Sequence, residues 1–300
     1  MIARRMATNT GVMSLTARDA TTRPASSTRT WRNVSLSLVG LAFGLVAIGW
    51  AGVSVPPRPF AAYPSRAGAV SYRPLPAGLP APVERYYRRL YGQRMPVIAS
   101  AVIDGRASMR PAGPVNIPAR FRFTHQAGQN YRHYIEATFF GLTIMKVNER
   151  YLDGVGLGET PFGAASGPQQ DQGANLGLWA ESLWLPSVYL TDPRVTWLPV
   201  DEQTAKLRVP FGNTLETFTV RFDPDTGLPR TFTALRYKGV SGPKVLWTCS
   251  VIRWGDLNGA LTALESTILW QGDAQPWVTF RVENIVFNAN VKAYLRGKGI

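Results

Sequence analysis

The sequence predicts a mainly β (α+β) fold: a curved antiparallel sheet, or half-barrel, with a lid helix, preceded by one transmembrane helix. Three observations predict this architecture. Polar and apolar residues alternate in about ten short segments after residue 100, as they do in strands that bury one face. An uncharged stretch of membrane-spanning length precedes these segments, and one almost wholly apolar helical segment interrupts them.

The uncharged stretch is Ser35–Val55, which as a helix would be about 31 Å long, close to the hydrocarbon thickness of a bilayer. Trp31 and Trp50 lie near its ends, where indole rings favour the membrane interface, and Pro56 ends the helix. A cleaved signal peptide is the alternative. However, the stretch exceeds the usual apolar core of roughly 7–15 residues, and no good small-x-small cleavage site follows it. We therefore expect a single-pass anchor in the cell membrane.

The formal net charge of +14 is concentrated beside this stretch. It is +5 over residues 1–34 and +6 over residues 56–96, but only +3 over residues 97–300. Basic flanks fit attraction to anionic lipid headgroups. No compact basic face with interleaved aromatic residues is evident, which argues against a nucleic-acid partner. The six Arg residues before the helix favour a cytoplasmic N-terminus and an extracytoplasmic C-terminal domain.

We expect four parts along the chain. Residues 1–34 form a disordered basic tail, residues 35–55 the transmembrane helix, residues 56–78 a proline-rich extended linker, and residues 79–300 the β half-barrel domain. The last part is long enough to bury one sizeable core. Its single cysteine, Cys249, alternates with apolar residues, which predicts a buried thiol and no intramolecular disulfide.

The expected strands begin with a hairpin over residues 119–139, in which Phe121 and Phe123 share one face. The later expected strands are Leu142–Val147, Arg150–Val155, Arg194–Pro199, Thr204–Val209, Leu215–Phe222, Leu228–Tyr237, Lys244–Trp254, Leu261–Trp270 and Val278–Phe287. The segment Gly154–Gly158 predicts a turn rather than a phosphate-binding loop, because no helix clearly starts there.

The two histidines of the sequence both lie in the first hairpin. A turn centred on Gly128 makes His125 and His133 diagonal neighbours on one sheet face. A metal site needs three or four convergent ligands. Glu136 points to the opposite face, so no third ligand is evident. We expect packed or hydrogen-bonded structural histidines and no metal site, with a metal or acid–base role as the alternative.

The segment Asp171–Tyr189 predicts a helix with apolar residues on nearly all sides. Such a helix should be buried, or should cover the mouth of a sheet. Within it, we expect Glu181 to be solvent-facing or hydrogen-bonded, with a functional carboxylate as the alternative. A shorter amphipathic helix begins near Ala81, and we expect it to pack on the β body rather than on a membrane surface.

Three of the most characteristic segments are DQGANLGLWAESLWLPSVYLTDPRVTW, ARFRFTHQAGQNYRHYIEATFFG and LPAPVERYYRRLYG. From about Leu79 to the C-terminus, the chain resembles an uncharacterised family of bacterial membrane-anchored proteins of unknown function. The core of that family is similar to the lipoprotein-carrier type of β half-barrel, in which a curved sheet and lid helices enclose a hydrophobic cavity. The resemblance implies a fold and supplies no catalytic residues.

We expect a membrane-anchored, non-enzymatic domain that binds a lipid or other hydrophobic ligand beneath the helix at residues 171–189. The candidate cavity or lid residues are Leu176, Trp179, Leu183, Trp184, Phe121, Phe123 and His133. We expect no catalytic residue, cofactor or metal. The expected partners are membrane lipids, an apolar small molecule and an unidentified envelope protein, and we expect no nucleic acid.

Two alternatives stay open. One is a structural or protein-partner-binding envelope protein without a ligand cavity, and the least favoured is a hydrolase-type enzyme. An enclosed apolar void of several hundred Å3 would favour ligand binding over a filled core, because ligand pockets have volumes of roughly 300–1,000 Å3. Loss of an activity on substitution of His125, His133 or Glu181 would favour the enzyme.

Overall fold

The computed structural model describes residues 27–65, 67–111 and 113–298 of a chain that divides into two units, residues 1–48 and residues 49–300. Helix α1 (Ser27–Ser54) begins in the first unit and ends in the second. Its segment Trp31–Ser54 is long and apolar enough to cross a membrane, a test that a signal sequence near an N-terminus also passes. The expected helix is present and starts earlier than predicted, whereas its role as an anchor stays a prediction.

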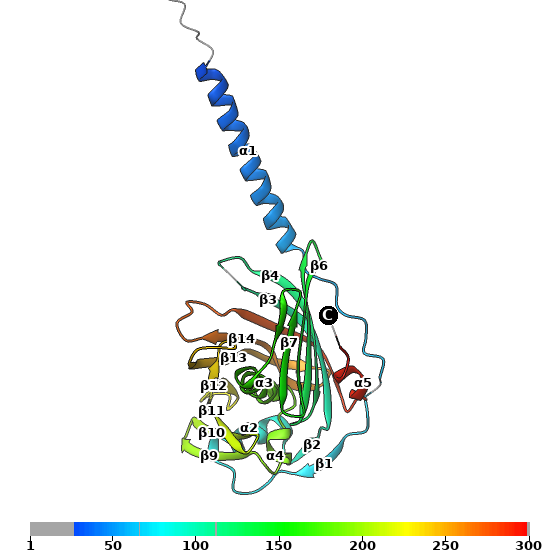
Figure 1. The fold of residues 1–300 in the computed structure, drawn as a ribbon. Coiled ribbons are helices and arrows are strands. Elements are labelled where there is room, and N and C mark those ends of the chain that lie inside the picture. Colours follow the sequence, from blue (N-terminus) through cyan, green and yellow to red (C-terminus); the bar gives the residue numbers. More distant parts are fainter. Residues whose placement is uncertain (1–26, 66, 112, 299–300) are drawn as a thin grey trace, which may run out of the picture. The chain divides into compact units, whose positions relative to one another are not determined.

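The second unit is built on one antiparallel sheet of thirteen strands. In spatial order they are β8 (Gly163–Ala165), β7 (Val155–Thr160), β6 (Leu142–Leu152), β5 (Asn130–Phe139), β4 (Ile117–Gln126), β3 (Ser100–Met109), β15 (Val278–Phe287), β14 (Ala260–Trp270), β13 (Lys244–Leu257), β12 (Pro229–Tyr237), β11 (Thr214–Phe222), β10 (Thr204–Phe211) and β9 (Thr196–Asp201). Two meanders, β3 to β8 and β9 to β15, therefore join where β3 pairs with β15. The sheet curves, and the predicted fold class is confirmed (Figure 1).

Helix α3 (Pro168–Glu181) lies inside the curve of the sheet and contacts both meanders, β6 and β7 of the first and β10 and β12 of the second (Figure 1). Its side chains Leu176, Leu178 and Trp179 are at most 1% exposed. Residues 172–180 are all buried, so this part of the helix is enclosed by protein, as a segment with apolar residues on nearly all sides predicts.

The predicted single helix over residues 171–189 is wrong in its extent. The structure has α3, then a 3-10 turn (Ser182–Trp184) and a short helix α4 (Val188–Thr191). The chain enters α3 earlier than predicted, because Pro168 fits the first helical turn, where its missing N–H needs no partner. Helical backbone has ended by Leu185 (φ −136°, ψ 53°), because this residue precedes Pro186, whose ring disfavours helical backbone at that position.

Two further differences concern strands. Residues 142–152 form one strand, β6, where two were predicted. The glycine-rich segment turns only at Gly154 (φ 89°), and Gly156 and Gly158 lie in β7. A Cβ atom at Gly156 would lie 2.7 Å from the carbonyl oxygen of Gln170. Gly156 is therefore the point at which β7 approaches the backbone of α3 closely.

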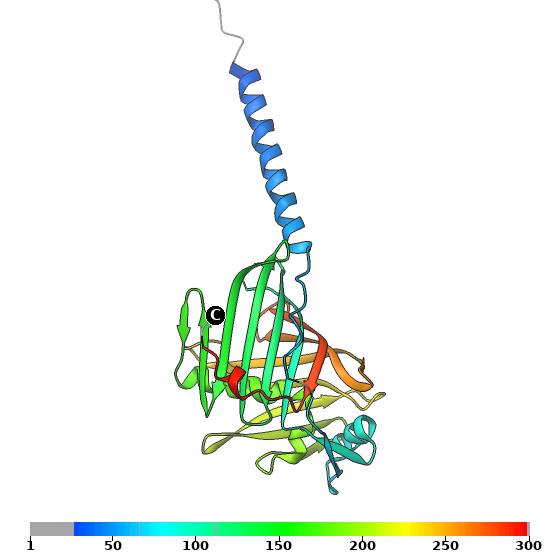
Figure 2. The ribbon, with the colours of Figure 1, turned by 90° about the vertical axis from the view of Figure 1, so that its right-hand side faces the viewer.

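The remaining elements cover the ends and the outside of the sheet. The predicted helix near residue 81 is α2 (Ala81–Tyr91), which buries one face. Strands β1 (Ser71–Pro74) and β2 (Arg94–Val97) form a separate two-stranded sheet, with β1 inside the predicted linker. Helix α5 (Lys292–Leu295) packs on the outer face of β4 and β5 (Figure 2). The predicted tail 1–34 lies mostly outside the described residues, and the domain boundaries stay predictions.

Gly156→Ala should lower the free energy of unfolding by about 1–3 kcal/mol, because the added methyl group overlaps the backbone of α3. The matched control is Gly158→Ala on the same strand face, where a Cβ atom would meet its nearest neighbour at an ordinary 3.5 Å. Urea unfolding of the full chain in detergent, followed by tryptophan fluorescence, compares the two variants. Equal stability would contradict the close approach of β7 to α3.

Candidate functional site

A cavity of about 230 Å3 lies between α3 and the inner face of the sheet. From the helix side it is lined by Gly177, Ala180 and Glu181, which are three and four residues apart and so share one helix face. The first two are small, so α3 does not fill the space in front of the sheet. The apolar lining from the strands includes Met109, Phe123, Ile135, Trp247, Ile268 and Phe280.

The structure brings together four of the seven predicted site residues. Phe123, His133, Leu183 and Trp184 all line this cavity. The other three predicted residues, Leu176, Trp179 and Phe121, are at most 1% exposed and are not part of the lining. Phe121 packs directly behind Phe123, with ring centroids 4.5 Å apart. A role for any of the seven in ligand binding stays a prediction.

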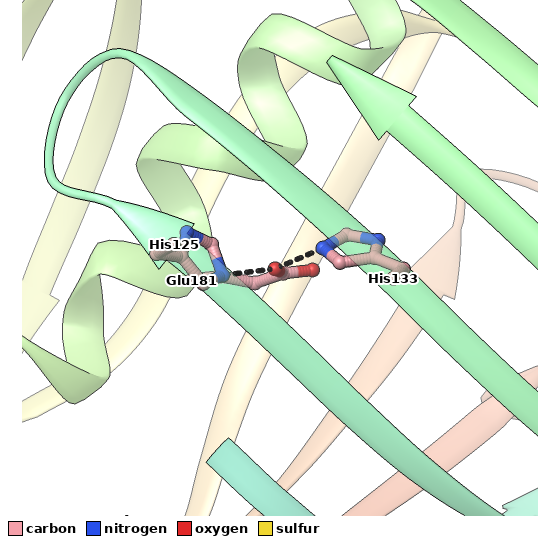
Figure 3. A group of neighbouring side chains, drawn as sticks. All are labelled: His125, His133 and Glu181. Carbon is pink, nitrogen blue, oxygen red and sulfur yellow. Dashed lines mark hydrogen bonds and ion pairs between the residues drawn. The ribbon is translucent and has the colours of Figure 1, made fainter. Parts of the chain in front are cut away.

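The two histidines reach the cavity region from the β4–β5 hairpin. The predicted register is confirmed, because His125 pairs with Tyr131 and His133 pairs with Phe123 across the two strands. Glu181, the last residue of α3, places its carboxylate between the two rings (Figure 3). Its Oε2 atom lies 3.1 Å from Nε2 of His125 and within hydrogen-bonding distance of Nε2 of His133.

This cluster is almost closed to solvent. The side chains of His125, His133 and Glu181 are 0%, 9% and 17% exposed. Burial lowers the pKa of His125, and hydrogen bonding to Glu181 opposes that shift. Burial alone would raise the pKa of Glu181, but the two histidines outweigh it and lower this pKa to about 2. Glu181 is therefore an ionised hydrogen-bond acceptor at neutral pH.

A second carboxylate supports the cluster from the neighbouring strand. Glu149 of β6 pairs with His133 in the sheet register, and its Oε1 lies 3.7 Å from Nδ1 of His133. Tyr131 donates its hydroxyl hydrogen bond to the same oxygen and stacks on His133, with ring centroids 3.9 Å apart. Sequence reasoning missed Glu149 because it divided β6, whereas the register of an undivided strand identifies the pair.

The sequence also gave no sign that Arg236 of β12 would line the cavity. Its Cζ atom lies 4.7 Å and 5.4 Å from the ring centroids of Trp247 and Trp270. Among the described residues the guanidinium has no hydrogen bond or ion pair, and its Nε is buried without a partner. The indole N–H groups of Trp247 and Trp277, which also line the cavity, are likewise buried without partners. Three residues of the cavity lining therefore carry buried hydrogen-bond donors that have no partner among the described residues.

The cluster and the cavity differ in what they can do chemically. Two imidazole nitrogens and one carboxylate oxygen, with all three atoms within 4.8 Å of one another, are groups that could hold a metal ion. The cavity offers an apolar interior with a few polar groups, which is the general form of a small-molecule site. Sequence reasoning found both histidines but looked for the third group at Glu136, which instead pairs with Arg120.

A larger hollow adjoins the cavity. This outer cleft has a volume of about 510 Å3 and is bounded by α2, β2 and the turn between β13 and β14. Leu183 and Trp184 line both the cleft and the cavity. Trp184 is held by a hydrogen bond of 2.9 Å from its Nε1 to the carbonyl oxygen of Ala263. The turn Ser182–Trp184 therefore separates the two spaces.

Comparison with known proteins gives a family and a fold. Residues 69–282 match the family described as "Family of unknown function (DUF6544)". No curated protein matches the sequence. The expected resemblance to an uncharacterised family is therefore confirmed.

Solved structures with a similar fold have low sequence identity. A LolA superfamily protein from Nitrosomonas europaea is 8% identical with a TM-score of 0.44, over 74% of this chain and 99% of that one. A Vibrio parahaemolyticus domain, whose name associates it with outer membrane lipoprotein sorting, is 10% identical with a TM-score of 0.40, over 71% and 94%. A DUF1329 family protein from Desulfovibrio piger is 13% identical with a TM-score of 0.39, over 67% and 90%. These likenesses concern the fold alone.

The thiol of Cys249, which lines the cavity, should react slowly with a thiol reagent in the native chain. Burial raises the pKa of this thiol from 9.0 to about 12, which leaves roughly 1,000-fold less thiolate at neutral pH. Labelling with a chromogenic disulfide before and after unfolding measures the difference at a single site, because the chain has one cysteine. Rapid stoichiometric labelling of the native chain would contradict the burial of the Cys249 thiol in the cavity wall.

Proposed function

This chain belongs to the DUF6544 family of unknown function, and we propose that its sheet-and-helix unit binds an acyl-type apolar ligand in the cavity beneath α3. In this proposal the protein is anchored by α1, with the ligand-binding unit outside the cytoplasm. The ligand is then a membrane lipid or a lipid-like molecule. The role is binding rather than catalysis.

One observation carries the proposal: an apolar cavity lies where a close-packed core is expected. Folded interiors contain few voids larger than a water molecule, whereas this one measures about 230 Å3. Burial of an acyl chain there would contribute about 0.8 kcal/mol per methylene. The alternative, a structural protein with a filled core, gives no reason for Gly177 and Ala180 to face aromatic strands across an empty space.

The position of the cavity supports a route for the ligand. A volume of about 230 Å3 lies below the roughly 300–1,000 Å3 of typical ligand pockets, whereas the outer cleft at about 510 Å3 lies within that range. The ligand would enter through the cleft and pass the turn Ser182–Trp184. Release of the hydrogen bond from Trp184 to Ala263 would join the two spaces.

The unpartnered donors support a ligand with an acidic end. A guanidinium without an acidic partner at an apolar cavity is costly, and a carboxylate or phosphate group would satisfy it. Arg236 is one of the lining residues, and its guanidinium, which has no ion pair among the described residues, would pair with such a group. The proposed ligand is therefore an amphiphile, with its chain toward Phe123 and Phe280 and its acid group near Arg236.

Exposed apolar side chains support a position at a membrane surface. Phe140, Leu142 and Ile144 are exposed at the β5–β6 hairpin. The backbone N–H of Phe140 donates a hydrogen bond of 2.8 Å to the carbonyl oxygen of Gly52, near the end of α1. If α1 spans the bilayer, this hairpin lies where lipid headgroups begin.

Brominated fatty acids should quench the fluorescence of Trp184 and Trp247 in the full chain, because bromine would lie beside these indoles. Ala180→Leu should weaken this binding at least about tenfold, because the larger side chain occupies the cavity. Ala180→Ser is the matched control without added bulk and should bind normally. Probe dissolved in the detergent or membrane also quenches Trp31 and Trp50 of α1. This background is the same in both variants and does not affect the comparison. Identical quenching curves for the two variants would contradict ligand binding in this cavity.

Arg236→Gln should remove a preference for acids over alcohols of the same chain length. In the native chain, a fatty acid should bind about tenfold or more tightly than the corresponding alcohol, because the carboxylate pairs with the guanidinium. Competition with the brominated probe measures both affinities. Equal affinity for acid and alcohol in the native chain would contradict the proposal that the ligand has an acidic group. It would not bear on the proposal that the apolar cavity binds an acyl chain.

A further inference from the structure

The convergence of both histidines on one carboxylate serves no purpose in acyl binding. The sequence has two histidines among 300 residues, and both lie within hydrogen-bonding distance of the same oxygen of Glu181. We propose that His125, His133 and Glu181 form a binding site for a divalent transition-metal ion of the zinc class. This site does not depend on whether the cavity binds a ligand.

One pair of the three donor atoms already lies near the spacing that such an ion requires. Zn²⁺ binds imidazole nitrogen and carboxylate oxygen at about 2.0–2.2 Å, so its tetrahedral ligands lie roughly 3.3–3.5 Å apart. Nε2 of His125 lies 3.1 Å from Oε2 of Glu181, and all three donor atoms lie within 4.8 Å of one another. Figure 3 shows both Nε2 atoms directed at the carboxylate between them. The carboxylate is in closer contact with Nε2 of His133, so the Glu181 side chain would move away from that ring to admit the ion.

The chemistry of the donors selects the class of ion. Imidazole suits Zn²⁺, Co²⁺, Ni²⁺ and Cu²⁺, whereas Mg²⁺ and Ca²⁺ prefer all-oxygen sites. Two histidines and one carboxylate form a three-ligand set of the type that leaves a coordination position open. Because His133 and Glu181 also line the cavity, that position would face it. Water or the acidic group of a bound ligand would complete the coordination.

The surroundings of His133 are those of an oriented metal ligand. Metal-binding histidines usually donate their second ring N–H to a carboxylate, which fixes the direction of the ring. Glu149 lies on that side of His133, with 3.7 Å between Oε1 and Nδ1, and is itself held by the hydroxyl of Tyr131. Glu149 would therefore act as a positioning residue rather than as a ligand.

The buried carboxylate of Glu181 also favours a cation. Among the described residues it has no Lys or Arg partner and pairs only with the two histidines. Buried charge is costly unless it is paired or ligated, and a divalent ion at Glu181 would ligate this carboxylate. It would also tie the end of α3 to β4 and β5.

Metal binding by the full chain tests the proposal. The protein is purified in detergent without a polyhistidine tag, stripped with EDTA and titrated with Zn²⁺ by calorimetry. We expect one ion per chain with a dissociation constant on the order of 1 µM or below. Co²⁺ should give the visible absorption bands of a low-coordinate site, and Zn²⁺ should raise the melting temperature. Failure of the native chain to bind either ion overturns the proposal.

Substitutions identify the ligands. Glu181→Gln and His133→Gln should each weaken Zn²⁺ binding by more than about 100-fold, and Glu149→Gln should weaken it by about 10–100-fold. The matched control is Glu136→Gln, which makes the same change at a glutamate that pairs with Arg120 outside the cluster and should leave Zn²⁺ binding normal. Melting curves of the metal-free variants verify folding, and the native titration decides the question if a variant is unfolded. Binding that survives Glu181→Gln, or is lost in Glu136→Gln, assigns the ion to other ligands and overturns this site.

Discussion

The burial of α3 within the curved sheet is the constraint on which the rest of the structure depends. Residues 172–180 of the helix, polar as well as apolar, are buried on every side, and the two meanders supply the protein around them. Its buried polar groups are matched to the strands: Gln172 donates to the carbonyl oxygen of Leu235 at 2.9 Å, and Asn175 accepts from the hydroxyl of Tyr151 at 3.1 Å. These contacts fix the rotation of the helix, which decides what faces the sheet.

The same rotation produces both the cavity and the histidine cluster. Gly177, Ala180 and Glu181 face inward together. The first two leave space in front of Trp247, while the third fills the gap between the histidines with a carboxylate. An apolar space and a polar cluster therefore share one wall. Helix α3 therefore acts as a lid. Its inner face borders both the cavity proposed for an acyl chain and the cluster of His125, His133 and Glu181.

The local sequence pattern predicted the strands of the sheet well. It predicted poorly which side chains of the helix and the sheet contact each other. The turn at Gly128 fixes the register of β4 and β5, so the pairing of His125 with Tyr131 followed from the sequence. Glu181 could not be placed in the same way, because tertiary packing sets the rotation of a helix that has apolar residues on nearly all sides. Arg236 reaches the cavity from the distant strand β12, a contact between meanders that no local periodicity encodes.

The central claim is that the space beneath α3 holds an acyl chain, and a crystal structure with a terminally brominated fatty acid tests it most directly. Diffraction measured at the bromine absorption edge locates the chain end without ambiguity. We expect an anomalous peak inside the cavity, beside Phe123, Trp184 and Trp247. A peak confined to the outer cleft or to the surface of α1, or no peak in crystals soaked to saturation, would contradict it.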